Sequence, residues 1–269
     1  MPEPVLGGPP PGQPASRRAA NTVTVLSARG GSGKTTLATN LAVALAERRG
    51  ESAVLLDLNL EFGTTAIALD LRPRYTLRDI ANAIESDVSD TELDALLLAH
   101  RSGLRLVPAL GEPGDSELIP DGGLPRLINR LRHTYDHVIV DGRPSFRDFM
   151  LDLWETSDTL LVTCPPDVVS VLLTRAMLDA FSVVRVNHDK VLIVLNEVTP
   201  RARLTLSQVQ KGLGTATFAV PYGGDALLTA ADLGQVYIQQ RPKDPAAVAL
   251  WRLADQVAER GRLEVAAAD

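Results

Sequence analysis

The sequence predicts an α/β fold: a single domain built on a twisted, mostly parallel sheet of about seven or eight strands, with helices on both faces. Three observations support this fold class. A chain of 269 residues with 45% hydrophobic content can bury one large core. Short apolar runs alternate with helix-patterned segments, which is typical of parallel strands joined by crossover helices. No internal repeat or second domain is visible, so we assign residues 21–262 to a single domain.

The two ends of the chain are expected to lie outside this domain. Residues 1–20 are rich in proline and glycine and lack the apolar segment of a signal peptide, so we expect a disordered leader. Residues 263–269 are expected to form a flexible tail. The longest apolar runs have the length of strands and are too short to span a membrane. We therefore expect a cytoplasmic protein.

Strands follow from apolar runs bounded by turn residues, and helices from the spacing of apolar residues between them. The predicted strands are residues 23–27, 53–57, 104–108, 137–141, 159–163, 191–196 and 215–220. The clearest predicted helices are residues 35–49, 123–135, 168–186 and 246–260. Gly50 is expected to end the first helix, and Pro165 with Pro166 marks the turn into the third.

A glycine-rich loop, RGGSGKTT at residues 29–36, joins the first predicted strand to the first predicted helix. Glycines let such a loop curl so that its N–H groups face one anion, and the helix N-terminus attracts the same charge. Lys34 can reach the β- and γ-phosphates, and the Thr35 hydroxyl can bind Mg²⁺. A plain glycine turn is the alternative, but the Gly-Lys-Thr ending in a strand-loop-helix context favours a nucleoside triphosphate. The predicted nucleotide-binding residues are Gly30, Gly31, Ser32, Gly33, Lys34, Thr35 and Thr36.

Two other predicted strands end in aspartate, and ligands of parallel sheets bind beyond the carboxyl ends of the strands. Asp141 closes the apolar run HVIVD, and Asp57 closes AVLLD. A carboxylate at such a strand end can hold Mg²⁺-bound water or orient the attacking water. The alternative is an aspartate that caps the following helix. With the phosphate loop present, we predict Thr35, Asp57 and Asp141 as the metal-binding residues.

The loop resembles the deviant phosphate loop of the MinD/ParA group of P-loop ATPases, whose pattern is KGGxGK[ST]. Ala28 stands where the usual motif begins with glycine, and Arg29 occupies the position of the group's signature lysine. In that group this lysine contacts the phosphates of the partner subunit. The resemblance therefore implies an ATP-dependent homodimer with Arg29 at the interface, although arginine is longer than lysine and not interchangeable with it.

Relatives in the MinD/ParA group carry Asp-x-Asp at the end of the second strand, whereas this chain has Asp57-Leu58-Asn59. Asn59 can orient a water molecule by hydrogen bonding, but it carries no charge and cannot act as a base. Nucleotide binding can therefore persist while turnover falls, and a scaffold that binds ATP without hydrolysing it remains an alternative. The resemblance implies an ATPase with the catalytic residues Lys34, Asp57, Asn59, Asp141 and Arg29.

Residues 56–84 resemble more specifically the CpaE/TadZ branch, ATPase-like proteins of tight-adherence (Flp/Tad) pilus assembly, with the pattern DLDLxFGxxA…LDLxPxxTLxD. The matching residues are Leu56, Asp57, Phe62, Gly63, Leu69, Asp70, Pro73, Thr76, Leu77 and Asp79, followed by residues 102–108. The resemblance implies a nucleotide-dependent dimer that positions the pilus secretion machinery, including its secretion ATPase, at the inner face of the membrane or at a cell pole.

Farther along the chain, the resemblance implies the residues around the base. Asn196 stands where related ATPases have an asparagine that contacts adenine, and Pro221 begins a loop that packs beside the base. An amide suits the donor and acceptor edge of adenine. A turn-forming asparagine is an equally weighted alternative for Asn196.

Composition limits the other function classes. The net charge of −6 argues against a protein that coats nucleic acid, so a DNA-partitioning ATPase is the less favoured alternative. The single cysteine, Cys164, excludes a disulfide within the chain and a four-cysteine metal site in one subunit. Mixed charges on the C-terminal helix indicate weak or indirect membrane association. A small-molecule kinase or ligase stays open, because an acceptor pocket assembled from separate loops leaves no sequence signature.

Overall fold

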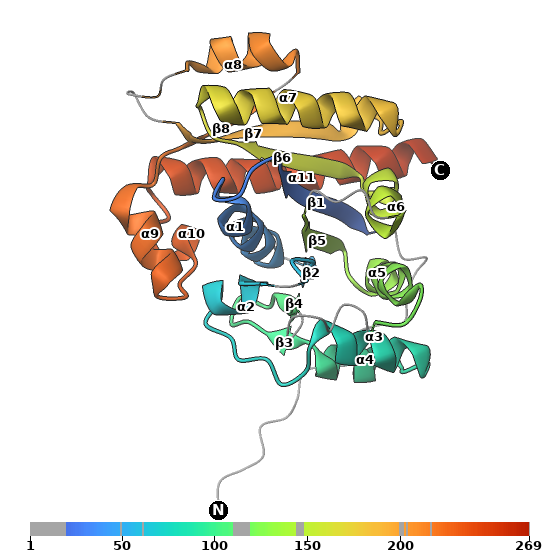
Figure 1. Ribbon diagram of the computed structural model, residues 1–269. Helices are drawn as coiled ribbons and strands as arrows, with labels where there is room; N and C mark the ends of the chain where they lie inside the picture. The colour runs from blue at the N-terminus through green and yellow to red at the C-terminus, as the bar shows by residue number, and fades with distance from the viewer. Residues whose placement is uncertain are drawn as a thin grey trace, which may run out of the picture.

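A single sheet of eight strands forms the centre of the molecule (Figure 1). The computed structural model describes residues 20–48, 50–60, 62–109, 119–143, 148–198, 202, 204–215 and 217–268. The strands are β1 (Asn21–Ser27), β2 (Ala53–Asp57), β3 (Leu98–Ala99), β4 (Arg105–Val107), β5 (His137–Asp141), β6 (Thr159–Cys164), β7 (Val191–Val198) and β8 (Thr217–Pro221). Their order across the sheet is β3-β4-β2-β5-β1-β6-β7-β8, and all pairs are parallel except β3 with β4.

Helices cover both faces of the sheet (Figure 1). In chain order they are α1 (Lys34–Ala46), α2 (Thr65–Ala68), α3 (Leu77–Glu85), α4 (Asp90–Leu96), α5 (Gly123–Thr134), α6 (Asp148–Thr156), α7 (Val168–Val183), α8 (Leu206–Leu213), α9 (Gly224–Asp232), α10 (Tyr237–Gln240) and α11 (Pro245–Ala268). A short 3₁₀ helix, His188–Lys190, precedes β7. Across the described residues, no helix is both long and apolar enough to cross a membrane.

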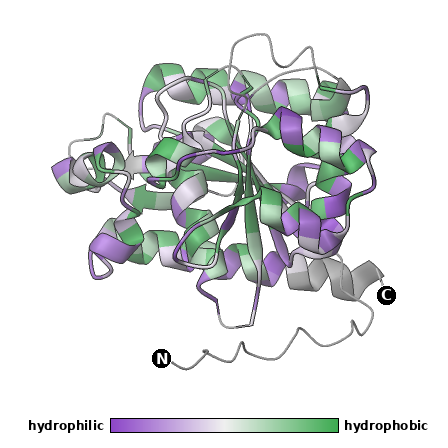
Figure 2. Cartoon of the chain, turned by 90° about the horizontal axis from the view of Figure 1, so that it is seen from below, coloured by the Kyte–Doolittle hydropathy of each residue, from purple (hydrophilic) through white to green (hydrophobic). Residues whose placement is uncertain are grey.

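Alternation along the central strands divides the core into two layers. In β5, Ile139 packs on the face covered by α1 and α11, whereas Val138 and Val140 pack on the opposite face with α5, α6 and α7. Successive side chains of a strand point to opposite faces, so a strand buried on both sides is apolar at every position. In Figure 2, the strands at the centre of the molecule are hydrophobic, and hydrophilic residues lie on the surrounding helices.

The predicted fold class is confirmed: a single α/β domain with an eight-stranded, mostly parallel sheet. The seven predicted strands correspond to β1, β2, β4, β5, β6, β7 and β8. The sequence did not reveal β3, because a two-residue antiparallel strand has no periodicity to detect. The predicted disordered leader falls almost entirely on residues 1–19, which lie outside the described residues.

Several helix boundaries differ from prediction. Helix α1 ends at Ala46 instead of residue 49, because a turn begins at Glu47; Gly50 has φ +80° beyond that turn. Helix α7 ends at Val183 instead of residue 186, since Arg185 adopts φ +60° and cannot continue a right-handed helix. Helix α11 continues past residue 260 to Ala268. These shifts leave the order of elements around the functional site unchanged.

Candidate functional site

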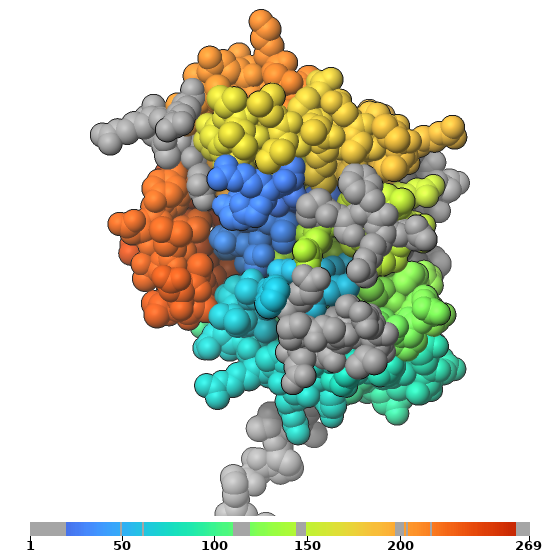
Figure 3. Space-filling view, viewed as in Figure 1, coloured from blue at the N-terminus to red at the C-terminus, as the bar shows by residue number. Residues whose placement is uncertain are grey.

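The candidate site lies where parallel strands end and the loop between β1 and α1 begins. Strand β1 lies between β5 and β6, so the loop that follows it is close to the ends of both neighbours. Figure 3 shows this loop and the start of α1 in blue, exposed between α7 and the α9 region. A cavity of about 460 Å³ opens beside the loop, within the usual size range of small-molecule sites.

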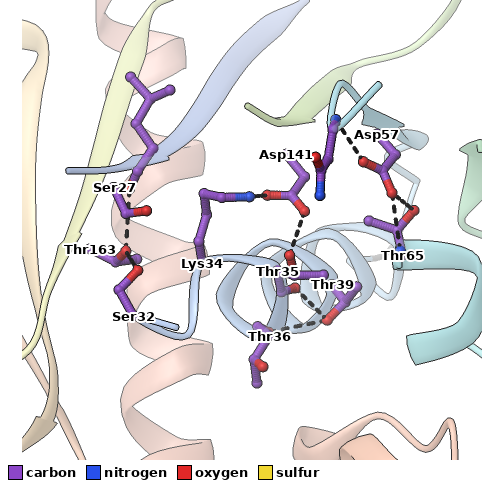
Figure 4. A network of polar contacts seen from close by, with 12 residues as sticks. Ser27, Ser32, Lys34, Thr35, Thr36, Thr39, Asp57, Thr65, Asp141 and Thr163 are labelled. Carbon is purple, nitrogen blue, oxygen red and sulfur yellow. Dashed lines mark hydrogen bonds and ion pairs between the residues drawn. The ribbon is translucent and has the colours of Figure 1, made fainter. Parts of the chain in front are cut away.

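Polar contacts with strands β1 and β6 fix the conformation of the loop. The hydroxyls of Ser32 and Thr163 are 2.8 Å apart, and Thr163 Oγ1 also donates to the carbonyl oxygen of Leu26 at 3.3 Å (Figure 4). At the start of the loop, Ser27 Oγ donates to the carbonyl oxygen of Arg29 at 2.9 Å. These contacts fix the curl before any ligand binds, so little ordering is needed on binding.

Glycine is required inside the loop for two separate reasons. Gly31 and Gly33 have φ values of +70° and +79°, in the left-handed region that favours glycine. A Cβ atom on Gly33 would also lie 2.2 Å from Asn196 Nδ2, closer than any real contact. The predicted glycine-rich phosphate loop therefore has both the backbone shape and the lack of side chains that close approach to an anion demands.

Lys34, Thr35 and Asp141 meet at the end of the loop, as Figure 4 shows. Lys34 Nζ forms an ion pair with Asp141 Oδ1, and Thr35 Oγ1 donates to Asp141 Oδ2 at 2.7 Å. The Asp141 side chain is 1% exposed, whereas Lys34 is 15% exposed at the cavity. Asp141 is thus the counter-ion of Lys34. The two side chains that contact it, Lys34 and Thr35, are the predicted phosphate and Mg²⁺ ligands.

Asp57 lies beside this group, because it pairs in register with Asp141 across β2 and β5. Its Oδ1 accepts from the backbone N–H of Asn59 at 2.9 Å, and its Oδ2 accepts from both the N–H and the hydroxyl of Thr65, at 3.1 and 2.8 Å (Figure 4). Gly63 closes over it, since a Cβ there would lie 2.6 Å from Asp57 Oδ2. Asp57 therefore fixes Asn59 and Thr65 against the end of β2.

The electrostatic setting of Asp57 differs from that of an exposed carboxylate. Burial is the largest effect and raises the pKa of Asp57 above its ordinary value, and the negative charge of Asp141 raises it further. Hydrogen bonds from Thr65 and Asn59 oppose this shift without cancelling it. A cation placed near both carboxylates would relieve the repulsion, which suits the predicted Mg²⁺ site. Direct metal binding by Asp57 stays a prediction.

Asn59 lines the cavity, and its amide is already partly used. Its Nδ2 donates to the carbonyl oxygen of Phe62 at 2.8 Å. The amide oxygen remains able to accept a hydrogen bond, for instance from a water molecule. The predicted role of Asn59 in orienting water is therefore compatible with its contacts, whereas proton abstraction is not available to an amide.

Arg29 is held within its own subunit. Its side chain is half exposed, and Nη1 lies 3.3 Å from both Asp167 Oδ2 and Ser170 Oγ. Asp167 is the N-cap of α7 and accepts from the backbone N–H of Ser170 at 3.0 Å and from its hydroxyl at 2.7 Å. These two bonds hold the pKa of Asp167 below its ordinary value, with a smaller contribution from the Arg29 charge. A cross-subunit contact by Arg29, still a prediction, would require it to leave Asp167.

Apart from the phosphate loop, the lining of the cavity is mostly apolar. Its walls are formed by Leu37, Val220, Pro221, Tyr222, Gly223, Leu227, Leu228 and Leu250, with Asn196 on the side of the phosphate loop. Tyr222 is 47% exposed and is the only aromatic residue among these. A flat, apolar ligand group such as a nucleobase fits this lining. Asn196 and Pro221 were predicted here, and both line the cavity.

Sequence reasoning missed three residues that shape the site. Thr65 and Thr163 act through other residues, and neither belongs to a phosphate-loop motif. Tyr222 directly follows the predicted Pro221, so its position in the chain was the available signal. Within the described part of the chain, no three His, Cys, Asp or Glu side chains cluster as a metal site. A Mg²⁺ ion here would rely on Thr35, Asp141, phosphate oxygens and water, which is its usual mode of binding beside a nucleotide.

Several known proteins are similar to this chain in sequence and fold. The family described as an AAA domain matches residues 20–194. The chain is 27% identical over 168 residues to the uncharacterized protein MJECL24 of Methanocaldococcus jannaschii, a match covering 58% of this chain and 63% of that protein, which is less than two thirds of its length. It is 24% identical over 223 residues to the septum site-determining protein MinD of Thermotoga maritima, covering 80% of this chain and 79% of that protein.

Solved structures show the same fold. A ParA family ATPase from Chlorobium tepidum superimposes with a TM-score of 0.82 at 24% identity, over 88% of this chain and 99% of that chain. MinD from Pyrococcus horikoshii, solved in complex with Mg-ADP, superimposes with a TM-score of 0.74 at 17% identity, over 88% and 96% of the two chains. Identities this low support the fold and not a shared partner or substrate.

Proposed function

Because this chain belongs to the AAA domain family and to the MinD/ParA superfamily of P-loop ATPases, we propose that it binds ATP with Mg²⁺ and acts as a nucleotide-dependent switch that dimerises. Its output is the positioning or regulation of a Flp/Tad-type pilus assembly machinery. Hydrolysis of ATP to ADP and phosphate is weak, because Asn59 supplies no carboxylate beside the attacking water. The protein works in the cytoplasm and is recruited to the inner face of the membrane or to a cell pole by its partners.

One observation carries the nucleotide-binding proposal: Lys34, Thr35 and Asp141 converge at the end of a loop already curled around an open cavity. An incoming phosphate offers Lys34 a second anionic partner, and the N-terminus of α1 favours the same negative charge. Thr35 and Asp141 would hold Mg²⁺, which neutralises charge on the phosphate oxygens. The MinD structure with Mg-ADP, which shares this fold, is consistent with that choice of ligand.

The test is isothermal titration calorimetry, in which Mg-ATP is titrated into the purified protein. Lys34→Ala is expected to weaken binding by more than about tenfold, since hydrogen bonds to charged groups contribute roughly 1.5–3 kcal/mol. Lys211→Ala is the matched control, because Lys211 is an exposed lysine on α8, away from the cavity. Absence of ATP binding by the wild type, or equal affinity of Lys34→Ala, would contradict the proposal.

Dimerisation has its own test. With ATP and Mg²⁺, the wild type is expected to sediment as a dimer, and Arg29→Ala is expected to remain monomeric, because the variant loses the cation proposed to contact the partner's phosphates. Analytical ultracentrifugation with and without nucleotide measures this. If Arg29→Ala dimerises as well as the wild type, Arg29 has no role at the interface.

The pilus role is supported by the order of matching residues between Asp57 and Asp79, several of which have defined structural tasks. Gly63 closes over Asp57, and Thr76 with Asp79 caps α3. Phe62 is different: it is 69% exposed, on a segment tied to the nucleotide site through Asp57 and Asn59. An exposed aromatic in that place can contact a partner in a nucleotide-dependent way.

The second candidate is a ParA- or MinD-type partitioning or division-site ATPase, favoured by the match to Thermotoga maritima MinD over 80% of this chain. Binding assays with the pilus secretion ATPase and with DNA distinguish the two candidate functions. A pilus role predicts ATP-dependent capture of the pilus secretion ATPase, lost in Phe62→Ala. A partition role predicts ATP-dependent, salt-sensitive binding to nonspecific DNA. Tight DNA binding without any capture of the secretion ATPase would favour the second candidate.

A further inference from the structure

The end of β7 contains an irregularity that places Asn196 beside the phosphate loop. The register between β7 and β8 shifts between Leu195 and Val198, and pairing with β6 stops at Leu195. Such bulges turn a side chain away from the direction that regular pleating would give it. Asn196, inside this irregular stretch, therefore points along the sheet edge toward the loop instead of into either core layer.

Its contacts there are with the loop backbone. Asn196 Nδ2 donates to the carbonyl oxygen of Ser32 at 3.0 Å, across 164 positions in the sequence. The same nitrogen lies so close to Gly33 that a Cβ at that position would be 2.2 Å away. The Asn196 amide thus packs directly against the Ser32–Gly33 peptide, on the side of the loop where β7 ends.

A planar trans peptide fixes two groups at once. Its C=O and the following N–H point in opposite directions, so holding the Ser32 carbonyl toward Asn196 turns the Gly33 N–H to the other side. The Ser32 hydroxyl is held independently by Thr163 on β6. Ser32 is therefore fixed by two neighbouring strands, through its side chain and through its backbone.

We propose that Asn196 is a positioning residue for the phosphate loop: it holds the Ser32–Gly33 peptide in the orientation that receives phosphate. This role differs from contact with the base, because it acts at the opposite end of the ligand and needs no base at all. It also gives a second reason for glycine at position 33, in addition to the positive φ: a side chain there would collide with Asn196. The inference rests on the proposed nucleotide-binding function.

A ligand without a base separates the two roles. Inorganic tripolyphosphate with Mg²⁺ presents the phosphates alone, so a residue that only contacts the base cannot affect its binding. Calorimetry with Mg-tripolyphosphate and with Mg-ATP is expected to show that Asn196→Ala weakens both by a similar factor, about three- to tenfold, as expected for the loss of one hydrogen bond. Asn82→Ala, an exposed asparagine on α3, is the matched control.

A second variant and a second measurement guard against misfolding. Asn196→Leu keeps nearly the same side-chain shape but has no donor, and it is expected to reproduce the loss seen with alanine. Hydrogen exchange of the loop amides in nucleotide-free protein is expected to be faster in both variants than in the wild type or Asn82→Ala, while exchange in β1 and β5 stays unchanged.

The outcomes distinguish the inference from the proposed function. If the wild type binds tripolyphosphate and ATP, but the Asn196 variants bind tripolyphosphate equally well and lose affinity only for ATP, Asn196 contacts the base and the positioning role is wrong. If the wild type binds neither ligand, the proposed function itself fails and the inference with it. Parallel losses for both ligands, with faster loop exchange, support the inference.

Discussion

Asn59 shows how one atom can change what a site does. Its backbone N–H donates to Asp57, and its side-chain nitrogen donates to the Phe62 carbonyl, a hydrogen bond that the carboxylate of an aspartate could not make. What it lacks is a charge and a group able to accept a proton. In the proposed function, this residue would separate binding of the nucleotide, which needs the loop, from cleavage, which needs an activated water.

Asn59→Asp is expected to raise ATP turnover by at least about tenfold, a conservative share of the ~10²–10⁴-fold that positioned acid–base groups contribute. Affinity for Mg-ATP should stay within a few-fold of the wild type. Phosphate release under saturating ATP measures the change, with Lys34→Ala as the inactive control. Brisk hydrolysis by the wild type that Asn59→Ala leaves unchanged would show that Asn59 does not limit turnover.

At this scale, the sequence predicted which residues lie together at the candidate site. Lys34 and Thr35 meet Asp141 in the structure, because the phosphate loop follows β1 and Asp141 ends the neighbouring parallel strand β5. Residues that act through others were not predictable: Thr65 and Thr163 are defined only by what folding places next to them. The contact between Arg29 and Asp167 joins positions 138 residues apart and follows from no local pattern.

Among the elements, α3 explains why part of the matched motif has its particular residues. Thr76 is the N-cap and Asp79 the third residue of the helix, and each side chain bonds to the other's backbone N–H, which forms a capping box. Leu77 between them is fully buried in the core. A capping box can be recognised in a short stretch of sequence, so the start of such a helix is predictable. The ends of α1 and α7 lie at turns that have no comparable sequence pattern.

Thr76→Ala is expected to lower the free energy of unfolding by about 1 kcal/mol, the usual effect of removing a hydroxyl N-cap. Thr229→Ala, on an exposed position of α9 without a cap role, should change it by less than about 0.5 kcal/mol. Urea unfolding followed by circular dichroism gives both values. Equal effects of the two substitutions would mean that the capping box adds nothing to stability.

Asp94 connects α4 to the edge of the sheet and gives a pH-dependent prediction. Its Oδ1 accepts from Arg105 Nε at 2.7 Å and from Tyr135 Oη at 2.8 Å, and its Oδ2 accepts from Arg105 Nη2 at 2.6 Å. Partial burial by itself would raise the pKa of Asp94, but the bonds from Arg105 and Tyr135 and the Arg105 charge outweigh it, so the pKa lies below its ordinary value of 3.8.

An acid whose pKa is lowered on folding adds stability above its unfolded pKa, and this stability is lost as the pH falls through its folded value. At pH 7, we expect the free energy of unfolding of the wild type to exceed that of Asp94→Asn by about 1 kcal/mol. This value is reduced for solvent screening, because the Asp94 side chain is 38% exposed. The difference should shrink below pH 4. Asp179→Asn, in the more exposed pair with Arg175, is the control and should show a much smaller change. A difference that persists unchanged at pH 2 would contradict this account.

Across the whole molecule, the strand order determines where the site can be. Strands β2, β5, β1 and β6 lie side by side and end at the same edge, so Asp57, Asp141 and the loop after β1 become neighbours although the sequence separates them widely. Apolar runs predicted that the sheet exists and is mostly parallel. The order of its strands could not be deduced from them, because every buried strand is apolar on both faces.

Ligand binding at this junction should stabilise the whole domain. Mg-ATP at about 100 times its dissociation constant adds roughly 2.7 kcal/mol to the unfolding free energy, which for a domain of this size raises Tm by about 5 °C or more. Differential scanning calorimetry with Mg-ATP against Mg²⁺ alone measures the shift, and Lys34→Ala should show little of it. An equal shift in Lys34→Ala would place the stabilising site elsewhere on the molecule.

The two-residue strand β3 has a consequence for how the protein meets its partners. It forms one outer edge of the sheet and pairs antiparallel with β4 through Leu98 and Ala99 alone. So short an edge offers few backbone groups to a strand from another chain, which also limits edge-to-edge aggregation. Assembly through an added strand is thus disfavoured on this side, and recognition there must use side chains displayed by helices and loops.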